Sequence, residues 1–257
     1  GVFNKKKDLK PSDKERPLPA PINPDCNEKI YRDFLFYKHF FASPAPLIVC
    51  EGKTDNIYIK AAIRRLAGEF PQLAEKKEDG SVKLNIKFFQ RTHTTDRFLG
   101  LTGGTSQLVA LIKDYMAFLR HAPANAERQP VILLIDNDDG ADGILGYFKN
   151  ITKQAAINRS VEFLPFCENL FVVPTPLTKD GKHTMIEDFF ERKWLEKELG
   201  GKTFNPNDDH KGFDHKAHYG KAYFAEHVIK KNEKEIDFSE FKPILNRIVS
   251  AISYPKA

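Results

Sequence analysis

Residues Val131 to Gly140 read VILLIDNDDG, an apolar run that ends in a cluster of acids. A continuous apolar run predicts a strand that is covered on both faces, as in a parallel sheet between two layers of helices. In open α/β sheets, ligands bind beyond the carboxyl ends of the strands. We therefore expect Asp136 and Asp138, which follow the strand, to border a functional crevice.

A second apolar run ends in an acid in the same way. Leu47 to Cys50 is followed by Glu51 and Gly52. If the two strands are neighbours, Glu51 converges with Asp136 and Asp138, and close carboxylates raise one another's pKa unless a cation lies among them. Hard oxygen ligands of this kind suit Mg²⁺ or Mn²⁺, which can organise a phosphate group. The pattern predicts a metal site for phosphoryl chemistry.

Helical and strand patterns alternate around these two runs. We expect helices over residues 56–66, 107–122 and 143–155, and further strands over 82–89 and 169–174. The alternating order predicts an α/β fold with a parallel, doubly wound sheet and helices on both faces.

The two ends of the chain differ from this central region. Residues 1–25 are rich in Lys and Pro, which predicts a linker or an extended arm. We expect residues 1–43 to be a linker and the tail of an upstream domain, 44–190 to be the catalytic domain, and 191–257 to be a mostly helical extension. Because the chain begins with Gly1 instead of Met, we expect it to be part of a longer or processed polypeptide.

Composition limits the class of protein. The 257 residues are 41% hydrophobic and include 21 Phe, enough for a sizeable core. No apolar run is long enough to span a membrane or serve as a secretion signal, so we expect a cytoplasmic protein with no membrane partner. The 3 isolated cysteines argue against a disulfide framework and a structural zinc site. A net charge of +5 favours polyanionic partners.

Three common motifs fail at specific positions. A P-loop requires a glycine five positions before Gly52, where Leu47 stands. An EF-hand that begins at Asp136 requires glycine at its sixth position and an acid at its twelfth, where Ala141 and Tyr147 stand. The haloacid dehalogenase pattern matches both acids of Asp-x-Asp but not the Thr or Val that should follow, and it normally lies at the first strand.

The remaining pattern resembles the Toprim domain, which topoisomerases, bacterial primases and OLD-type nucleases share. Its motifs occur in the family's order and span about 90 residues: Glu51 and Gly52 after a strand, Gly103 and Gly104 in a turn, and Asp136 and Asp138 after a later strand. A topoisomerase or primase fragment would also need a domain with a nucleophilic tyrosine or a zinc module, and neither is visible in the sequence. The resemblance therefore favours a nuclease.

The resemblance implies roles for further residues. Glu187 in MIEDFF and Lys221 in YGKAYFAEHV look like the additional acid and lysine of OLD-like nucleases, and Asp55 stands where related nucleases have an extra acid. The implied metal ligands are Glu51, Asp55, Asp136, Asp138 and Glu187, and the implied catalytic residues are Glu51, Asp136, Asp138 and Lys221. The implied phosphate-binding residues are Lys53, Gly103 and Gly104.

Several of these residues also have simpler interpretations. Thr54 or Asp55 can cap the following helix, and Glu187 and Asp188 can begin a helix at its positive end. Lys221 can be an ordinary exposed lysine, and Gly103-Gly104 a plain turn. The histidines around Asp214 could bind zinc, but they lack cysteine partners.

A closer resemblance covers Lys29 to Ala67, which is similar to the junction in retron reverse transcriptases that carry a C-terminal Toprim domain. It implies a Mg²⁺-dependent endonuclease that cleaves RNA (such as tRNA) or DNA, as the toxic effector of a bacterial anti-phage system. The implied partners are the upstream reverse transcriptase domain and its RNA–DNA product, and a homo-oligomer is left open. The alternative is a non-catalytic nucleic-acid-binding or assembly module for that polymerase.

Overall fold

A five-stranded, mostly parallel sheet and eight helices form an α/β fold in the part of the chain that the computed structural model describes. That part comprises residues 26–101, 105–123, 126–208 and 212–255. The strands are β1 (Leu47–Cys50), β4 (Lys87–Phe88), β5 (Val131–Ile135), β6 (Leu164–Cys167) and β7 (Leu170–Pro174), in the order β4-β1-β5-β7-β6. The expected N-terminal linker and the Gly103-Gly104 turn lie outside the described residues.

The sheet is mixed, so the expectation of an entirely parallel sheet is wrong at one edge. Strands β4, β1, β5 and β7 are parallel, but β6 pairs antiparallel with β7. Only Glu168 and Asn169 separate β6 from β7. A connection this short permits a hairpin, whereas a parallel pair needs a crossover of a dozen or more residues.

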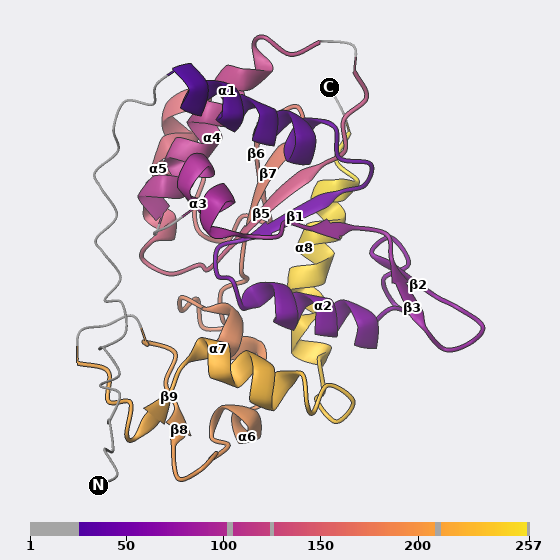
Figure 1. Ribbon diagram of the computed structural model, residues 1–257, viewed down its shortest axis with the longest axis vertical. Coiled ribbons are helices and arrows are strands. Elements are labelled where there is room, and N and C mark those ends of the chain that lie inside the picture. Colours follow the sequence, from indigo (N-terminus) through magenta and orange to yellow (C-terminus); the bar gives the residue numbers. More distant parts are fainter. Residues whose placement is uncertain (1–25, 102–104, 124–125, 209–211, 256–257) are drawn as a thin grey trace, which may run out of the picture.

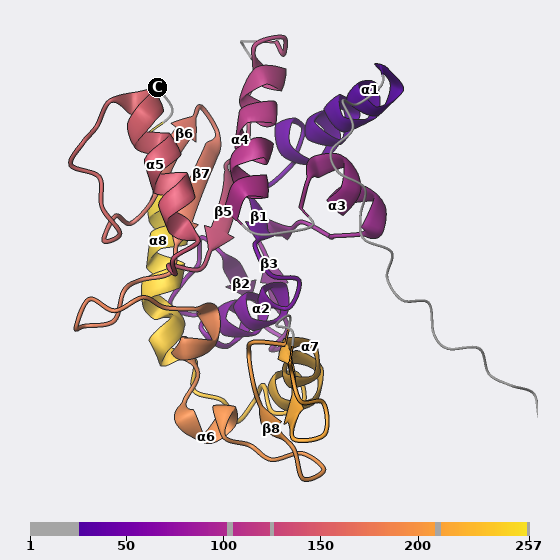
Figure 2. The same cartoon turned by 90° about the vertical axis from the view of Figure 1, so that its left-hand side faces the viewer.

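Helices cover both faces of the sheet (Figures 1 and 2). Helices α1 (Cys26–Leu35), α4 (Thr105–Leu119) and α5 (Ala141–Thr152) share a hydrophobic core with one face, and α2 (Asp55–Arg65) and α8 (Lys242–Ile252) share a core with the other. Side chains of β5 alternate between the two cores, because successive residues of a strand point to opposite faces. The three expected central helices are therefore confirmed, with ends shifted by at most three residues.

The expected strand over residues 82–89 is wrong as a single element. Its first half is β3 (Val82–Leu84), which pairs antiparallel with β2 (Ala74–Lys76) in a separate hairpin. Its second half is β4, which pairs parallel with β1 at the sheet edge. Apolar alternation predicts extended backbone, but it does not reveal where a strand changes its partner.

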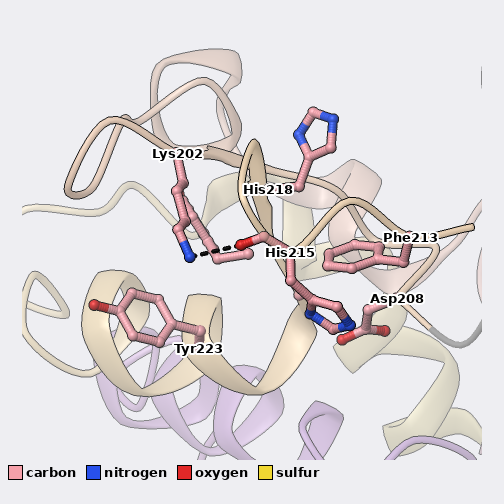
Figure 3. Close-up of a pocket in the computed structure, with 8 residues that line it drawn as sticks. Lys202, Asp208, Phe213, His215, His218 and Tyr223 are labelled. Atoms are coloured by element: carbon pink, nitrogen blue, oxygen red, sulfur yellow. Dashed lines mark hydrogen bonds between the residues drawn. The ribbon is translucent and has the colours of Figure 1, made fainter.

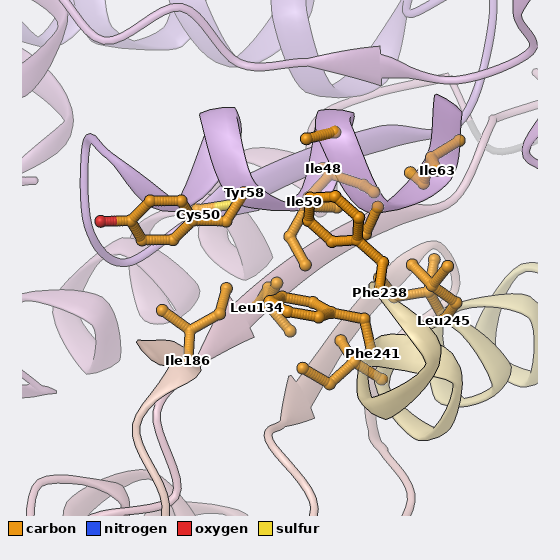
Figure 4. Close-up of a cluster of buried hydrophobic side chains, with 14 of the residues drawn as sticks. Ile48, Cys50, Tyr58, Ile59, Ile63, Leu134, Ile186, Phe238, Phe241 and Leu245 are labelled. Atoms are coloured by element: carbon orange, nitrogen blue, oxygen red, sulfur yellow. The ribbon is translucent and has the colours of Figure 1, made fainter. Parts of the chain in front are cut away.

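The C-terminal region packs directly on the sheet. It contains α6 (Arg192–Leu195), α7 (Lys221–Phe224) and α8, together with a two-stranded pair of β8 (Thr203–Phe204) and β9 (His218–Tyr219). Figure 4 shows Ile59 of α2 close to Phe238 and Phe241, two residues of the short segment directly before α8. This region and the sheet therefore share one hydrophobic core.

None of the helices in the described ranges is both long enough and apolar enough to cross a lipid bilayer.

The shared core predicts a large effect of Phe241→Ala. The Phe241 side chain is fully buried and packs against the rings of Phe189, Phe190 and Phe238. Its removal should lower the free energy of unfolding by about 3–5 kcal/mol in urea denaturation. Phe34→Ala is the matched control, because Phe34 is half exposed on α1 and should change stability by about 0.5 kcal/mol. Equal effects of the two substitutions would contradict this account of the core.

Candidate functional site

The pairing of β1 with β5 brings the two sequence-predicted acidic motifs together. The parallel register runs from Leu47↔Val131 to Cys50↔Leu134, and the Glu51 N–H extends it by donating to the Leu134 carbonyl at 3.0 Å. Both strands therefore end at the same edge of the sheet. There, the backbone N–H of Asp136 donates to Oε2 of Glu51 at 3.3 Å.

Asn137 holds the acidic segment in place from the opposite side. It is fully buried, its N–H lies 2.9 Å from the Thr184 carbonyl, and its side-chain amide donates to the Thr175 and Arg159 carbonyls at 2.9 Å. Neighbouring side chains of an extended segment point to opposite sides. The anchoring of Asn137 therefore directs Asp136 and Asp138 away from it, a role that the sequence analysis did not recognise.

Asp55 turns back toward the end of β1. Its Oδ2 accepts the Gly52 N–H at 2.8 Å, and the side chain is 5% exposed. A Cβ at Gly52 would lie 2.6–2.9 Å from this carboxylate, so the contact requires glycine there. Thr54 occupies the N-cap position of α2 but makes no side-chain capping bond. Asp55 therefore belongs to the acid cluster and binds the β1–α2 turn instead of capping the helix.

Glu187 and Lys221 reach the cluster from the C-terminal region. Glu187 is 2% exposed; its Oε2 lies 3.2 Å from Nζ of Lys221, and its Oε1 is buried without a hydrogen-bond partner among the described residues. Asp136 Oδ1 accepts the Ile186 N–H at 2.8 Å, which ties the Glu187 segment to the end of β5. The neighbouring Asp188 is exposed and only caps its own turn, by accepting the Met185 N–H.

The four carboxylates, of which Asp55 and Glu187 are buried and Glu51 and Asp136 are partly buried, oppose one another's ionisation. Burial raises the pKa of Glu51 to about 6, with further upward contributions from Asp138 and Asp55. Burial raises the pKa of Glu187, and the nearby Lys221 ammonium lowers it. The net result is a rise to about 7. Burial, Asp55 and Glu187 raise the pKa of Asp136 well above its ordinary value, and burial raises that of Asp55.

Lys221 is a cation that faces these acids, and it acts on all four of them. Burial lowers its pKa, but attraction to Glu187, Asp136 and Asp55 outweighs this effect, so its pKa is raised overall. One ammonium group does not balance four carboxylates. The cluster therefore favours a further cation at neutral pH.

The donor set fits a hard divalent cation in chemistry and charge. Every acidic side chain offers oxygen ligands, and Oε1 of Glu187 is a buried acceptor that finds no donor within the described ranges. However, no three His, Cys, Asp or Glu side chains in the described ranges are gathered closely enough to hold a metal ion as they stand. A cation bound by three of these carboxylates would therefore require at least one of them to change its rotamer.

Arg91 is a second residue that the sequence analysis missed. Its guanidinium donates to the carbonyls of Glu51 and Leu101, and its Nε lies 2.9 Å from Oδ1 of Asp96. It therefore joins the end of β1 to Leu101, which follows α3 in the sequence. Asp96 lies on the short helix α3 (His93–Leu99), which was also not predicted, although its Thr92/Thr95 capping box is a local signal for a helix start.

Lys53 lies at the edge of the site. Its side chain is 67% exposed, and Nζ lies 3.3 Å from Oδ2 of the buried Asp96. This places an exposed ammonium in the turn between β1 and α2, where a substrate phosphate could reach it. The zinc alternative gains no support, because Nδ1 of His218 is bonded to Oγ1 of Thr203 at 2.9 Å.

In comparisons with known proteins, no family model and no solved structure matches the chain.

The raised pKa of Glu187 predicts a pH-dependent stability. Because its pKa rises from 4.5 to about 7 on folding, the folded state binds more protons within this window, and the free energy of unfolding falls as pH increases through it. Glu187→Gln removes the buried charge. In EDTA at about pH 8, we expect the variant to be more stable than the parent protein by on the order of 2–3 kcal/mol, and at about pH 4 we expect no such difference.

Urea denaturation at several pH values measures this effect. Asp188→Asn is the matched control, because it neutralises the exposed acid next to Glu187 and should leave the pH dependence unchanged. A Glu187→Gln protein that is less stable than the parent at about pH 8 would show that the Lys221 ion pair outweighs the burial of the charge.

Proposed function

We propose that this chain is a metal-dependent nuclease that hydrolyses phosphodiester bonds in RNA, such as tRNA, or in DNA. The observation that carries the proposal is the convergence of Glu51, Asp136, Asp55 and Glu187 with Lys221 at the carboxyl ends of β1 and β5. Buried acids with raised pKa values and a nearby lysine are typical of catalytic sites. Oxygen ligands in excess of the available positive charge favour Mg²⁺ or Mn²⁺ chemistry on phosphate.

We further propose that the fold is of the Toprim type and close to that of OLD-like nucleases. The support is the position of each motif: Glu51-Gly52 follows β1, Asp136-x-Asp138 follows the adjacent β5, and Glu187 and Lys221 come from later segments. By the resemblance of residues 29–67, the nuclease would be the effector attached to a retron reverse transcriptase. Its partners would be that enzyme and its RNA–DNA product.

A bound Mg²⁺ would be held by a subset of Glu51, Asp55, Asp136, Asp138 and Glu187, and it would activate water and offset charge on the scissile phosphate. Glu51 has a pKa of about 6, so near neutral pH its carboxyl group can both accept and return a proton. Lys221 carries a stable positive charge that can stabilise negative charge on the phosphate or leaving group. Lys53 would contact the substrate backbone as an exposed point charge.

The alternative function is a non-catalytic module that binds nucleic acid or assembles with the upstream polymerase. One observation favours it: no three acidic, His or Cys side chains in the described ranges form a ready metal-binding group. If these side chains never come together around a metal ion, the buried acids have a structural role only. Activity measurements on a conservative variant distinguish the two functions.

Asp136→Asn is that variant. The amide keeps an oxygen that can accept the Ile186 N–H but lacks the charge needed by a cation. With Mg²⁺ or Mn²⁺ and a panel of tRNA, messenger RNA, and single- and double-stranded DNA, we expect the parent protein to cleave at least one substrate. Asp136→Asn should lower that rate by about 100-fold or more.

Asp188→Asn is the control, because Asp188 is an exposed acid on the neighbouring segment that accepts only a local backbone bond. It should cleave at the parental rate, and EDTA should abolish cleavage by both proteins. Full activity in EDTA, or equal activity of Asp136→Asn and the parent protein, would exclude the metal-dependent mechanism.

A further inference from the structure

A hollow of about 340 Å³ lies beside the acid cluster, between the β8–β9 segment and α7. Its size is near the lower end of the range for small-molecule sites. Figure 3 shows Tyr223 of α7 on one side, and Phe213 and His215 on the other. The lining residues are Lys202, Asp208, Phe213, His215, His218, Tyr219, Gly220 and Tyr223.

Aromatic surface in the hollow is accessible to a ligand. Tyr223 is 46% exposed, and its ring packs against that of His227, with ring centroids 4.0 Å apart. By contrast, Tyr219 is buried and its hydroxyl donates to the Lys197 carbonyl. Tyr223 is therefore a rigid, exposed platform of the kind on which a flat ring can stack.

The polar groups of the hollow favour a ligand with acceptors and negative charge. Lys202 brings an ammonium group, whose Nζ is held 2.6 Å from the His215 carbonyl, and His215 adds imidazole nitrogens. Asp208, the acid among the described residues that line the hollow, already accepts the Lys221 N–H at 2.9 Å. A Cβ at Gly220 would overlap the Asp208 carboxylate, so this acid is packed against the backbone and occupied there.

The hollow and the acid cluster meet at consecutive residues. Gly220 lines the hollow, and Lys221, the next residue, places its ammonium 3.2 Å from Glu187. Consecutive Cα atoms lie about 3.8 Å apart, so the two sites border the same turn of the chain. A ligand that fills the hollow can therefore extend toward the proposed phosphate site.

We propose that this hollow binds one unstacked nucleotide of a single-stranded RNA or DNA, with its base on Tyr223 and its backbone directed toward Lys221. An aromatic platform combined with nearby cations is the general means by which proteins bind single strands. That the bound strand is also the substrate rests on the proposed nuclease function. That the hollow binds a nucleotide does not. The site selects single strands, because the bases of a duplex are stacked and cannot enter it.

Binding is tested in the full chain with Asp136→Asn as background, so that the probe is not cleaved. The probes are fluorescein-labelled oligouridylate and oligothymidylate of about ten nucleotides, measured by anisotropy at about 0.15 M salt. We expect Tyr223→Ala to weaken binding of at least one probe by about tenfold, and Tyr223→Phe, which keeps the ring, to remain within about twofold of the background. The comparison between the two probes distinguishes an RNA site from a DNA site.

Tyr254→Ala is the matched control, because Tyr254 is 45% exposed but packs against the rings of Phe163 and Phe171 and does not line the hollow. It should not change binding. A Tyr223→Ala protein that binds both probes as tightly as the background would overturn the proposal. An equal loss of affinity for a duplex of the same length would also overturn it.

The outcome is separable from that of the nuclease proposal. If the parent protein cleaves nothing but Tyr223→Ala still weakens single-strand binding, the nucleotide site stands and the nuclease function fails. If metal-dependent cleavage occurs and Tyr223→Ala changes neither binding nor cleavage, the nuclease function stands and the nucleotide site fails.

Discussion

The parallel pairing of β1 with β5 is the interaction on which the candidate site depends. Its hydrogen-bond ladder continues past the strands to the Glu51 N–H and the Leu134 carbonyl, and it ends with the Asp136 N–H against the Glu51 carboxylate. Two acids that lie 85 residues apart in sequence are thereby held against each other. Burial raises the pKa of both, because loss of water penalises the charged carboxylate, and neighbouring acids such as Asp55 add to the rise.

Holding like charges together requires a rigid frame, and the two hydrophobic cores supply it. The β5 side chains are buried on both faces, and α8 packs on the same face of the sheet as α2. Arg91 and Asn137 add local restraints, since each donates to two backbone carbonyls, one of which directly follows a strand: Glu51 after β1 for Arg91, and Thr175 after β7 for Asn137. The repulsion among the acids is therefore offset by packing elsewhere, a pattern expected at functional sites.

Much of this arrangement could be predicted from local sequence patterns. The apolar run at Val131 to Ile135 indicated a doubly covered strand, and the acids after it were placed at the correct edge of the sheet. The predictions failed where the structure depends on which strands pair with each other. Residues 82–89 divide between two sheets, and β6 pairs with β7 as a hairpin. Arg91 was missed because nothing in its local sequence distinguishes a buried, carbonyl-binding arginine from an exposed one.

The sequence by itself determined the strand and helix periodicities and the types of ligand atom, because both follow from the order of residue types along the chain. Only the tertiary structure decided that Glu187 and Lys221 reach the acids of β1 and β5. It also decided that Oε1 of Glu187 is left without a donor, and that an aromatic hollow adjoins Lys221. These features arise from contacts between segments far apart in sequence, and their energies depend on burial, which no local pattern specifies.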